Sequence, residues 1–157
     1  MTKTTWDGLP IASDWPTGAA VVVFRRASTG LELLVLHRAH SGPEYEGDWA
    51  WTPPTGARFP GEDVLVCAAR ELHEEAGLSL PMTRLDEGES WARFVAEAPL
   101  DVVVTMHDAE HDRYEWVAPE VALSRVAPET VRDGLRKALD WIDGQVLPAD
   151  PEAEATA

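Results

Sequence analysis

The feature that most restricts the fold is the stretch GARFPGEDVLVCAARELHEEAGL, residues 56–78. Within it, apolar side chains recur with the period of a helix, which places a stripe of them on one face. That stripe consists of Leu65, Ala68, Ala69, Leu72 and Ala76. Gly77 supplies the left-handed residue that ends many helices, and Leu78 can fold back as its apolar contact. The stretch therefore predicts an amphipathic helix over about residues 63–76.

The same helix carries three glutamates, Glu71, Glu74 and Glu75, with Arg70 beside them. Their spacing of i, i+3 and i+4 lets all three carboxylates point toward one spot. Like charges at this spacing repel unless something offsets them, and solvation on an exposed face is the ordinary explanation. The convergence favours a second explanation. Hard cations such as Mg²⁺ take oxygen ligands from carboxylates and substrate phosphates, so the cluster predicts a metal that also meets phosphate.

The composition argues against several kinds of partner for this site. The chain has 13 lysines and arginines against 28 aspartates and glutamates, and its net charge of −15 argues against general affinity for nucleic acid or anionic lipid. No apolar run approaches the roughly 20 residues that span a bilayer, and the start shows neither a signal nor a transit pattern. Cys67 is the only cysteine, so no intrachain disulfide or cysteine-based zinc site can form. We expect a cytoplasmic protein without a membrane or nucleic-acid partner.

Strands and helices are mixed along the rest of the chain, which favours one α/β domain over residues 19–146. The elements expected around the central helix are an irregular lead-in (1–18), a hairpin (19–26 and 31–38), two strands within 91–107, a strand at 113–118 and a helix at 128–143 that ends before Gly144. The acidic tail, residues 147–157, is expected to be disordered because it is polar and proline-rich.

The spacing of Gly56, Glu62 and the run from Arg70 to Leu78 resembles the complete Nudix box at every specified position. The resemblance implies the Nudix fold, an α/β/α sandwich around a mixed β-sheet. It also implies hydrolysis of a nucleoside diphosphate linked to another moiety, with dependence on Mg²⁺ or Mn²⁺. The substrate would then be a small-molecule nucleotide, handled by a monomer or a homodimer.

Roles within the box follow from the same resemblance. Glu71, Glu74 and Glu75 would be metal ligands, and Glu74 or Glu75 would accept the proton of the attacking water. Arg70 would hold the glutamates in place rather than touch substrate. Glu62 would be either an outer metal ligand or a structural cap.

A second stretch, HDAEHDRYEW at residues 107–116, is either a solvated acidic turn or part of the site. Its pattern of Glu110, His111, Tyr114 and Trp116 is similar to a stretch of the diadenosine tetraphosphate hydrolases within the Nudix family. By that similarity Glu110 would complete the catalytic site as a further metal ligand. Glu115 is its rival, although a strand would fix the direction of Glu115 by alternation.

The chain departs from that subgroup at one position, because Thr55 stands where a lysine usually precedes the box glycine. Three arginines could supply the charge instead, although each alone reads as a surface residue: Arg25, Arg38 and Arg58. Four aromatic residues could stack on a nucleobase: Tyr45, Trp49, Trp51 and Tyr114. Trp51 and Trp91 are nevertheless expected in the core, and Cys67 is expected to be a small buried hydrophobe.

These observations favour a metal-dependent pyrophosphohydrolase whose substrate could be a dinucleoside polyphosphate. Two alternatives stay open. One is a housecleaning hydrolase of oxidised or non-standard nucleoside triphosphates. The other is a Nudix module that senses a nucleotide without cutting it, although such modules usually have a degraded box.

Overall fold

The computed structural model describes residues 3–5, 7–86, 90–107 and 109–145. The acidic tail expected at residues 147–157 lies outside the described residues. In chain order the elements are β1 (Gly18–Ala27), β2 (Gly30–Arg38), β3 (Trp51–Thr52), β4 (Thr55–Ala57), α1 (Val64–Ala76), β5 (Thr83–Arg84), β6 (Trp91–Glu97), β7 (His111–Val117), α2 (Pro119–Arg125) and α3 (Glu129–Gln145).

The sheet is mixed and is organised around β1. This strand runs parallel to β6 along residues 18–24 and antiparallel to β2 and β4. Its first residues, 18–20, pair with β4, whereas residues 24–27 pair with β2. The sheet therefore forks at the middle of β1, with β4 on one branch and β2 on the other. The β2 branch also carries β3 and β7.

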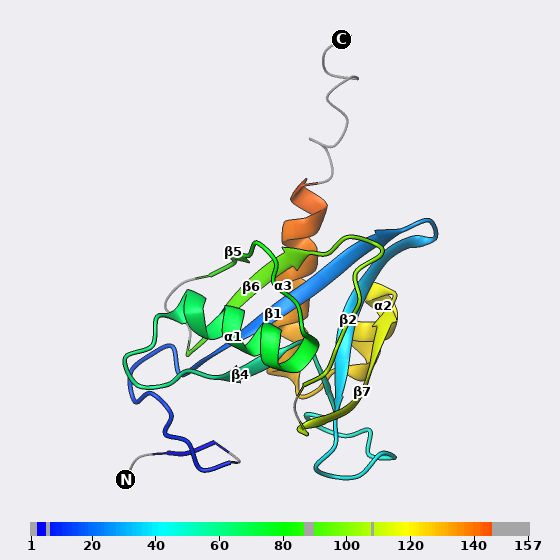
Figure 1. The fold of residues 1–157 in the computed structure, drawn as a ribbon. Helices are drawn as coiled ribbons and strands as arrows, with labels where there is room; N and C mark the ends of the chain where they lie inside the picture. Colours follow the sequence, from blue (N-terminus) through cyan, green and yellow to red (C-terminus); the bar gives the residue numbers. More distant parts are fainter. Residues whose placement is uncertain (1–2, 6, 87–89, 108, 146–157) are drawn as a thin grey trace.

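Helices cover both faces of this sheet, which confirms the expected α/β/α sandwich (Figure 1). Alternation along β1 explains the two cores. Val21 and Val23 pack with Leu72 and Ala76 of α1 on one face. Val22 and Phe24 face the opposite way, and their cluster also contains residues of α2 and α3: Ala122, Leu135, Ala138 and Ile142.

The central helix begins and ends where the sequence predicts, but its buried face is turned. Asp63 caps the N-terminus by accepting from the amides of Leu65 and Val66, and Gly77 ends the helix with a φ of 69°. Leu65 and Ala69, assigned to the apolar stripe, are exposed. Cys67, Glu71 and Glu75 are buried in their place, together with Ala68, Leu72 and Ala76. The helix thus presents two carboxylates to the sheet.

The structure also differs from the sequence-based expectations at other elements. Residues 91–107 form one strand, β6, and not two, because the amides of Thr105 and His107 bond to carbonyls at the end of α1. Helix α2, not expected from the sequence, follows β7. Helix α3 includes Gly144, which lies in its last turn. Trp51 is buried as expected, but Trp91 is only partly buried and lines two hollows described below.

Candidate active site

Strand β4 passes so close to helix α1 that Gly56 leaves no room for a side chain. A Cβ atom at position 56 would lie 2.0 Å from the carboxyl carbon of Glu71. The carboxylate of Glu71 fills this space and also accepts from Nη1 of Arg70 at 2.8 Å. The glycine of the box is therefore the residue that lets a buried glutamate lie against the sheet.

Arg70 connects the carboxylates of the box to one another. Its Nε and Nη2 donate to the two oxygens of Glu62, each at 2.9 Å, and Nη2 also donates to the carbonyl of Ala57. Its Nη1 lies 2.8 Å from Glu71 and 3.5 Å from Glu74. The bond from Arg70 is the main reason why the pKa of Glu62 is lowered. Arg70 thus fixes the carboxylates of Glu71 and Glu74, and Glu62 in turn fixes the guanidinium of Arg70.

Glu75 is the most deeply buried carboxylate of the box, with 1% of its surface exposed. Its Oε1 accepts the backbone N–H of Thr55 at 2.9 Å. Its Oε2 has no hydrogen-bond partner among the described residues. Burial raises the pKa of Glu75 well above its ordinary value, and the negative charges of Glu71 and Glu110 raise it further.

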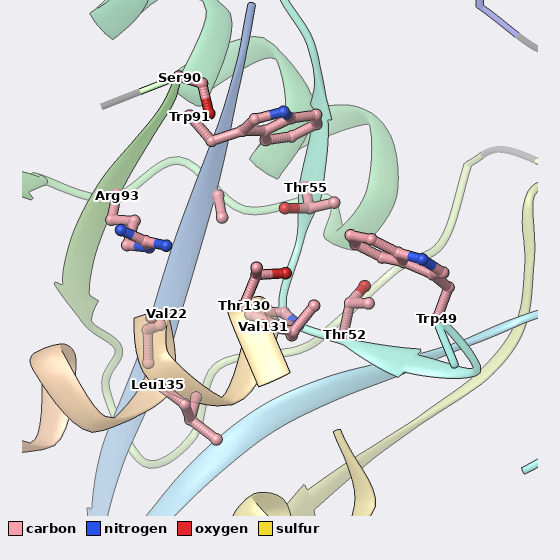
Figure 2. Close-up of a pocket in the computed structure, with 13 residues that line it drawn as sticks. Val22, Trp49, Thr52, Thr55, Ser90, Trp91, Arg93, Thr130, Val131 and Leu135 are labelled. Atoms are coloured by element: carbon pink, nitrogen blue, oxygen red, sulfur yellow. The ribbon is translucent and has the colours of Figure 1, made fainter. Parts of the chain in front are cut away.

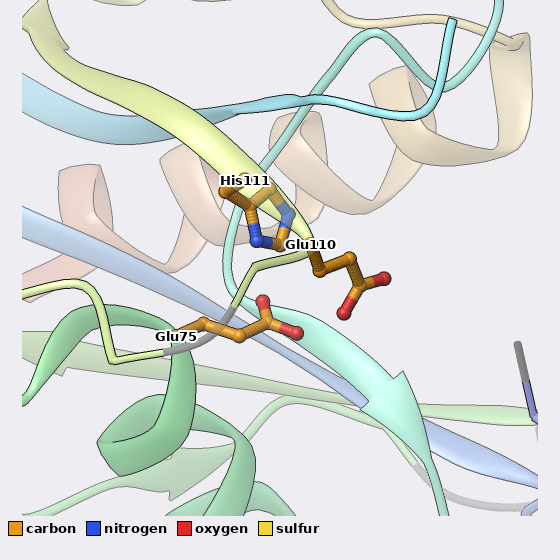
Figure 3. A group of neighbouring side chains, drawn as sticks. All are labelled: Glu75, Glu110 and His111. Carbon is orange, nitrogen blue, oxygen red and sulfur yellow. The ribbon is translucent and has the colours of Figure 1, made fainter. Parts of the chain in front are cut away.

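Figure 3 shows Glu75 extending from α1 toward Glu110 and His111 at the start of β7. One ligand atom from each of these three residues can be chosen so that all lie within 4.8 Å of one another. A carboxylate oxygen that is buried without a donor, beside a second carboxylate and an imidazole, is a donor set that fits a divalent cation. The residues present therefore fit a metal ion.

A cleft of about 730 Å³ reaches this group at Glu110, whereas Glu75 and His111 do not line it. Of the residues that the sequence assigns to the site, four line the cleft: Arg70, Glu71, Glu74 and Glu110. Glu74 is half-exposed at its rim. Arg38 also lines the cleft, with Nη2 3.6 Å from Glu110, and its buried Nε has no hydrogen-bond partner among the described residues.

The other two arginines that could bind phosphate, Arg25 and Arg58, do not line the cleft. Arg58 is buried, with 5% of its surface exposed, and its guanidinium donates to the carbonyls of Asp14, Pro16 and Glu62. Arg25 bonds to Glu32 at 2.7 Å and reaches the carbonyl of Leu100. Both are engaged in structural contacts, so Arg38 is the candidate arginine that lies in the cleft.

Glu110 and Glu115 occupy different surroundings. The backbone of Glu110 accepts from the amide of Ala39, which holds it beside the end of β2 and at the cleft. Glu115 forms an ion pair with Arg125 of α2.

We therefore expect Glu110→Gln to lower kcat at saturating Mg²⁺ at least about tenfold more than Glu115→Gln, the matched control. Steady-state kinetics of both variants would test this, and a larger loss for Glu115→Gln would contradict the assignment.

His111 is the residue that sequence reasoning missed. It is buried at the first position of β7 and joins Glu75 and Glu110 in the group of possible ligands. The five histidines show no metal-ligand spacing along the chain. The adjacent pair Glu110-His111 is visible in the sequence. Only the structure shows that the start of β7 brings both residues beside Glu75 of α1.

A second cavity, of about 330 Å³, lies on the α3 side of β1 (Figure 2). Thr55 and Trp91 line both this cavity and the cleft, so the two hollows are neighbours. Val131 and Leu135 of α3 form part of its apolar wall, and the indole of Trp49 stands at one side. Sequence reasoning did not anticipate this cavity, because its wall is assembled from distant segments.

A model of the NUDIX domain family matches residues 15–142 of the chain. The chain belongs to the Nudix family. The asymmetrical bis(5'-nucleosyl)-tetraphosphatase of Sus scrofa is 30% identical to this Nudix chain over 121 residues, which cover 65% of the chain and 78% of that protein. The crystal structure of a C. elegans Ap4A hydrolase binary complex superposes with a TM-score of 0.66 at 26% identity, and covers 81% of this chain and 97% of that one.

A further relative of this Nudix chain is an octanoyltransferase of Myxococcus xanthus, 33% identical over 135 residues. The match covers 78% of the chain but only 36% of that protein, so the chain spans about a third of its length. Within the described residues, no helix is long and apolar enough to cross a membrane. The comparisons confirm the expected Nudix fold, and with it the class of hydrolases that act on phosphoric anhydride bonds.

Proposed function

We propose that the protein is a divalent-metal-dependent pyrophosphohydrolase that cleaves a nucleoside diphosphate linked to another moiety, with dinucleoside polyphosphates as the substrate class. The observation that carries this proposal is the buried Oε2 of Glu75, which has no donor among the described residues and lies beside Glu110 and His111. The tetraphosphatase of Sus scrofa and the Ap4A hydrolase from C. elegans support the choice of substrate class.

Glu71, Glu75 and Glu110 would hold Mg²⁺ or Mn²⁺, with Glu74 at the rim of the cleft as a further ligand. The ion, when bound, neutralises phosphate oxygens and makes water a stronger nucleophile. Arg70 keeps the carboxylates of Glu71 and Glu74 turned toward this place. The chain itself thus supplies orientation, a buried site and the negative charge that attracts the cation.

Glu75 is the better candidate to accept the proton of the attacking water. In the metal-free protein its pKa is raised, first by burial and then by the negative charges of Glu71 and Glu110, and a raised pKa makes a carboxylate a stronger base. Glu74 is half-exposed at the rim, so its carboxylate is open to solvent.

The cavity on the α3 side is suited to one nucleoside of the substrate. Its volume lies in the range of small-molecule sites, and its walls combine two indoles with apolar side chains. Trp49 has a left-handed backbone, with a φ of 67°, and its amide bonds to the carbonyl of Ala127 at 2.7 Å. A bulky residue keeps such a backbone only where its surroundings demand it, which is typical of functional positions.

The metal requirement is tested by removing divalent ions with a chelator. Turnover of a dinucleoside tetraphosphate should fall below about 1% and return when Mg²⁺ or Mn²⁺ is added. The Tm of the protein should also rise with Mg²⁺ concentration, because a ligand that binds only the folded state stabilises it. Full turnover in excess chelator would contradict the metal mechanism.

A panel of dinucleoside polyphosphates, nucleotide sugars, ADP-ribose and nucleoside triphosphates would identify the substrate. Highest kcat/KM for a dinucleoside polyphosphate supports the proposal. Preference for an oxidised nucleoside triphosphate would identify a housecleaning hydrolase instead. Binding with no hydrolysis of any compound would identify a sensing module.

The role of Arg38 is tested by Arg38→Gln, with Arg25→Gln as the matched control. Arg38 lies in the cleft, and it can supply the positive charge that Thr55 does not. Its loss should therefore raise KM for a dinucleoside tetraphosphate about tenfold, which corresponds to the loss of one charged hydrogen bond. Arg25 bonds to Glu32 and does not line the cleft, so KM should stay within about twofold. Equal KM values for the two variants would remove Arg38 from the phosphate site.

A further inference from the structure

In the lead-in to the domain, residues 3–5 lie antiparallel to residues 9–11 and form a small hairpin. The amide of Thr5 bonds to the carbonyl of Leu9 at 2.7 Å, and the amide of Ile11 bonds to the carbonyl of Lys3 at 2.9 Å. Thr4 and Pro10 form an antiparallel bridge. The amide of Leu9 also donates to Oγ1 of Thr5 at 3.0 Å. Residues 3–5 and 7–11, here called the N-terminal hairpin, are therefore held together by backbone hydrogen bonds within the lead-in that the sequence predicts to be irregular.

Arg58 anchors the chain that leads out of the N-terminal hairpin. Its buried guanidinium bonds to the carbonyls of Asp14 and Pro16 and forms an ion pair with the carboxylate of Asp14 at 2.8 Å. Its own carbonyl accepts the amide of Ala12 at 2.8 Å. Arg58 lies just after β4, so these contacts hold the hairpin beside the segment that carries Gly56.

The cleft that contains Glu71 and Glu74 is also lined by four residues of the N-terminal hairpin: Thr5, Asp7, Leu9 and Ile11. Glu110, Arg38 and His40 line the same cleft. Leu9 keeps 44% of its surface exposed although it is apolar. An exposed leucine in a cleft offers apolar surface to a bound base or sugar, because removing that surface from water is favourable.

We propose that the N-terminal hairpin binds the second, non-reacting moiety of the substrate, with Leu9 and Ile11 as the surface that its base or sugar covers. The inference rests on the proposed pyrophosphohydrolase function. A dinucleoside polyphosphate has a nucleoside at each end of its phosphate chain. The cavity beside Trp91 offers a place for one, and the hairpin, which lines the cleft that contains Glu71 and Glu110, offers a place for the other.

The carboxylate that the hairpin places in the cleft supports an uncharged group there rather than more phosphate. Asp7 contributes a carboxylate to the cleft and bonds to the hydroxyl of Thr5. An additional phosphate beside Asp7 would meet repulsion, whereas a sugar or base beside Leu9 would not. The hairpin therefore selects for a nucleoside at the far end of the phosphate chain and against a free terminal phosphate.

The test compares Leu9→Ser with Leu100→Ser, an equally drastic change at another leucine, 55% exposed, that does not line the cleft. Two substrates are used with Mg²⁺: a dinucleoside tetraphosphate and the nucleoside tetraphosphate that lacks the second nucleoside. Leu9→Ser should raise KM for the dinucleoside about tenfold with kcat within about twofold, and change KM for the mononucleoside by less than about twofold. Leu100→Ser should change neither.

Calorimetric binding of a methylene-bridged, non-hydrolysable dinucleoside tetraphosphate gives a readout independent of turnover. The Kd should rise about tenfold in Leu9→Ser and stay unchanged in Leu100→Ser. Equal effects of Leu9→Ser on both substrates, or no effect on the Kd, would overturn the inference while wild-type turnover still supports the proposed function. No turnover by the wild type would overturn the proposed function, and the binding measurement would still decide whether the hairpin contacts the second nucleoside.

Discussion

Replacing Glu75 with glutamine is expected to lower kcat by about 10² to 10³ while leaving the fold intact. The glutamine oxygen can still accept the amide of Thr55, so the contact between α1 and β4 is kept. Its amide nitrogen can neither accept a proton nor bind a cation, and groups with these roles typically contribute such factors. Steady-state kinetics at saturating Mg²⁺ measures the loss. Near-wild-type rates in both Glu75→Gln and Glu74→Gln would place the chemistry outside the box.

The same substitution should raise the Tm of the metal-free protein at neutral pH. The pKa of Glu75 is raised in the folded state, first by burial and then by Glu71 and Glu110. A carboxyl with a raised pKa stabilises the fold fully below its ordinary value of about 4.5, and this contribution is lost as pH rises through the folded pKa. Glutamine does not titrate. The Tm difference, variant minus wild type, should therefore increase from about pH 5 to pH 8 and disappear in acid.

Thermal unfolding in the presence of a chelator measures this difference, since bound metal would offset the repulsion. For a chain of this size, each 1 kcal/mol corresponds to about 2–4 °C. A Tm difference that is constant between pH 4 and pH 8 would show that the carboxyl of Glu75 has an ordinary pKa in the folded protein.

Gly56→Ala is expected to lower kcat/KM by about 10² with little loss of stability. The new methyl group would occupy the space of the Glu71 carboxylate, 2.0 Å from its carboxyl carbon. The end of a glutamate side chain can move, so the backbone need not shift. A displaced metal ligand is costly to activity because misplacement of about 1 Å can reduce rates 10²-fold. Kinetics, together with the Mg²⁺ dependence of Tm, would measure both effects.

Gly144→Ala is the control for this substitution. Gly144 lies in helix α3 and has nothing within 4 Å of an added Cβ. Alanine should stabilise the helix by about 0.5–1 kcal/mol and leave kcat/KM unchanged. If Gly56→Ala retained full activity, Glu71 would not need its observed position.

The sequence predicted the central helix well because its signals are local. Asp63 and Gly77 cap the helix through their own conformations and neighbouring amides, which short-range pattern reading can detect. The orientation of the helix was predicted less well. Periodicity assigns carboxylates to solvent and aliphatic residues to the core, so it placed Leu65 inside and could not anticipate that Glu71 and Glu75 are buried.

The rest of the site depends on contacts between distant segments. His111 gains its place only because β7 pairs with β2 and begins beside α1. Arg58 resembles a surface residue in sequence, yet the lead-in folds over it and buries its charge among carbonyls. Val102 and Met106 lie in a run that is typical of a strand, but they pack on the core while the backbone of Thr105 bonds to helix α1.

The fork in the sheet has a consequence for where this enzyme is sensitive to mutation. Glu75 is tied to the β4 branch through the amide of Thr55, and Glu110 is tied to the β2 branch through the amide of Ala39. The two branches meet along β1, and residues 53–54 also join β3 of the β2 branch to β4. Val21 and Val23, in the middle of β1, are fully buried. The distance between Glu75 and Glu110, the proposed metal ligands, therefore depends on packing around β1 inside the core. A methyl group added or removed there should alter cation affinity at a distance, so that metal selectivity can evolve without any change to the ligands themselves.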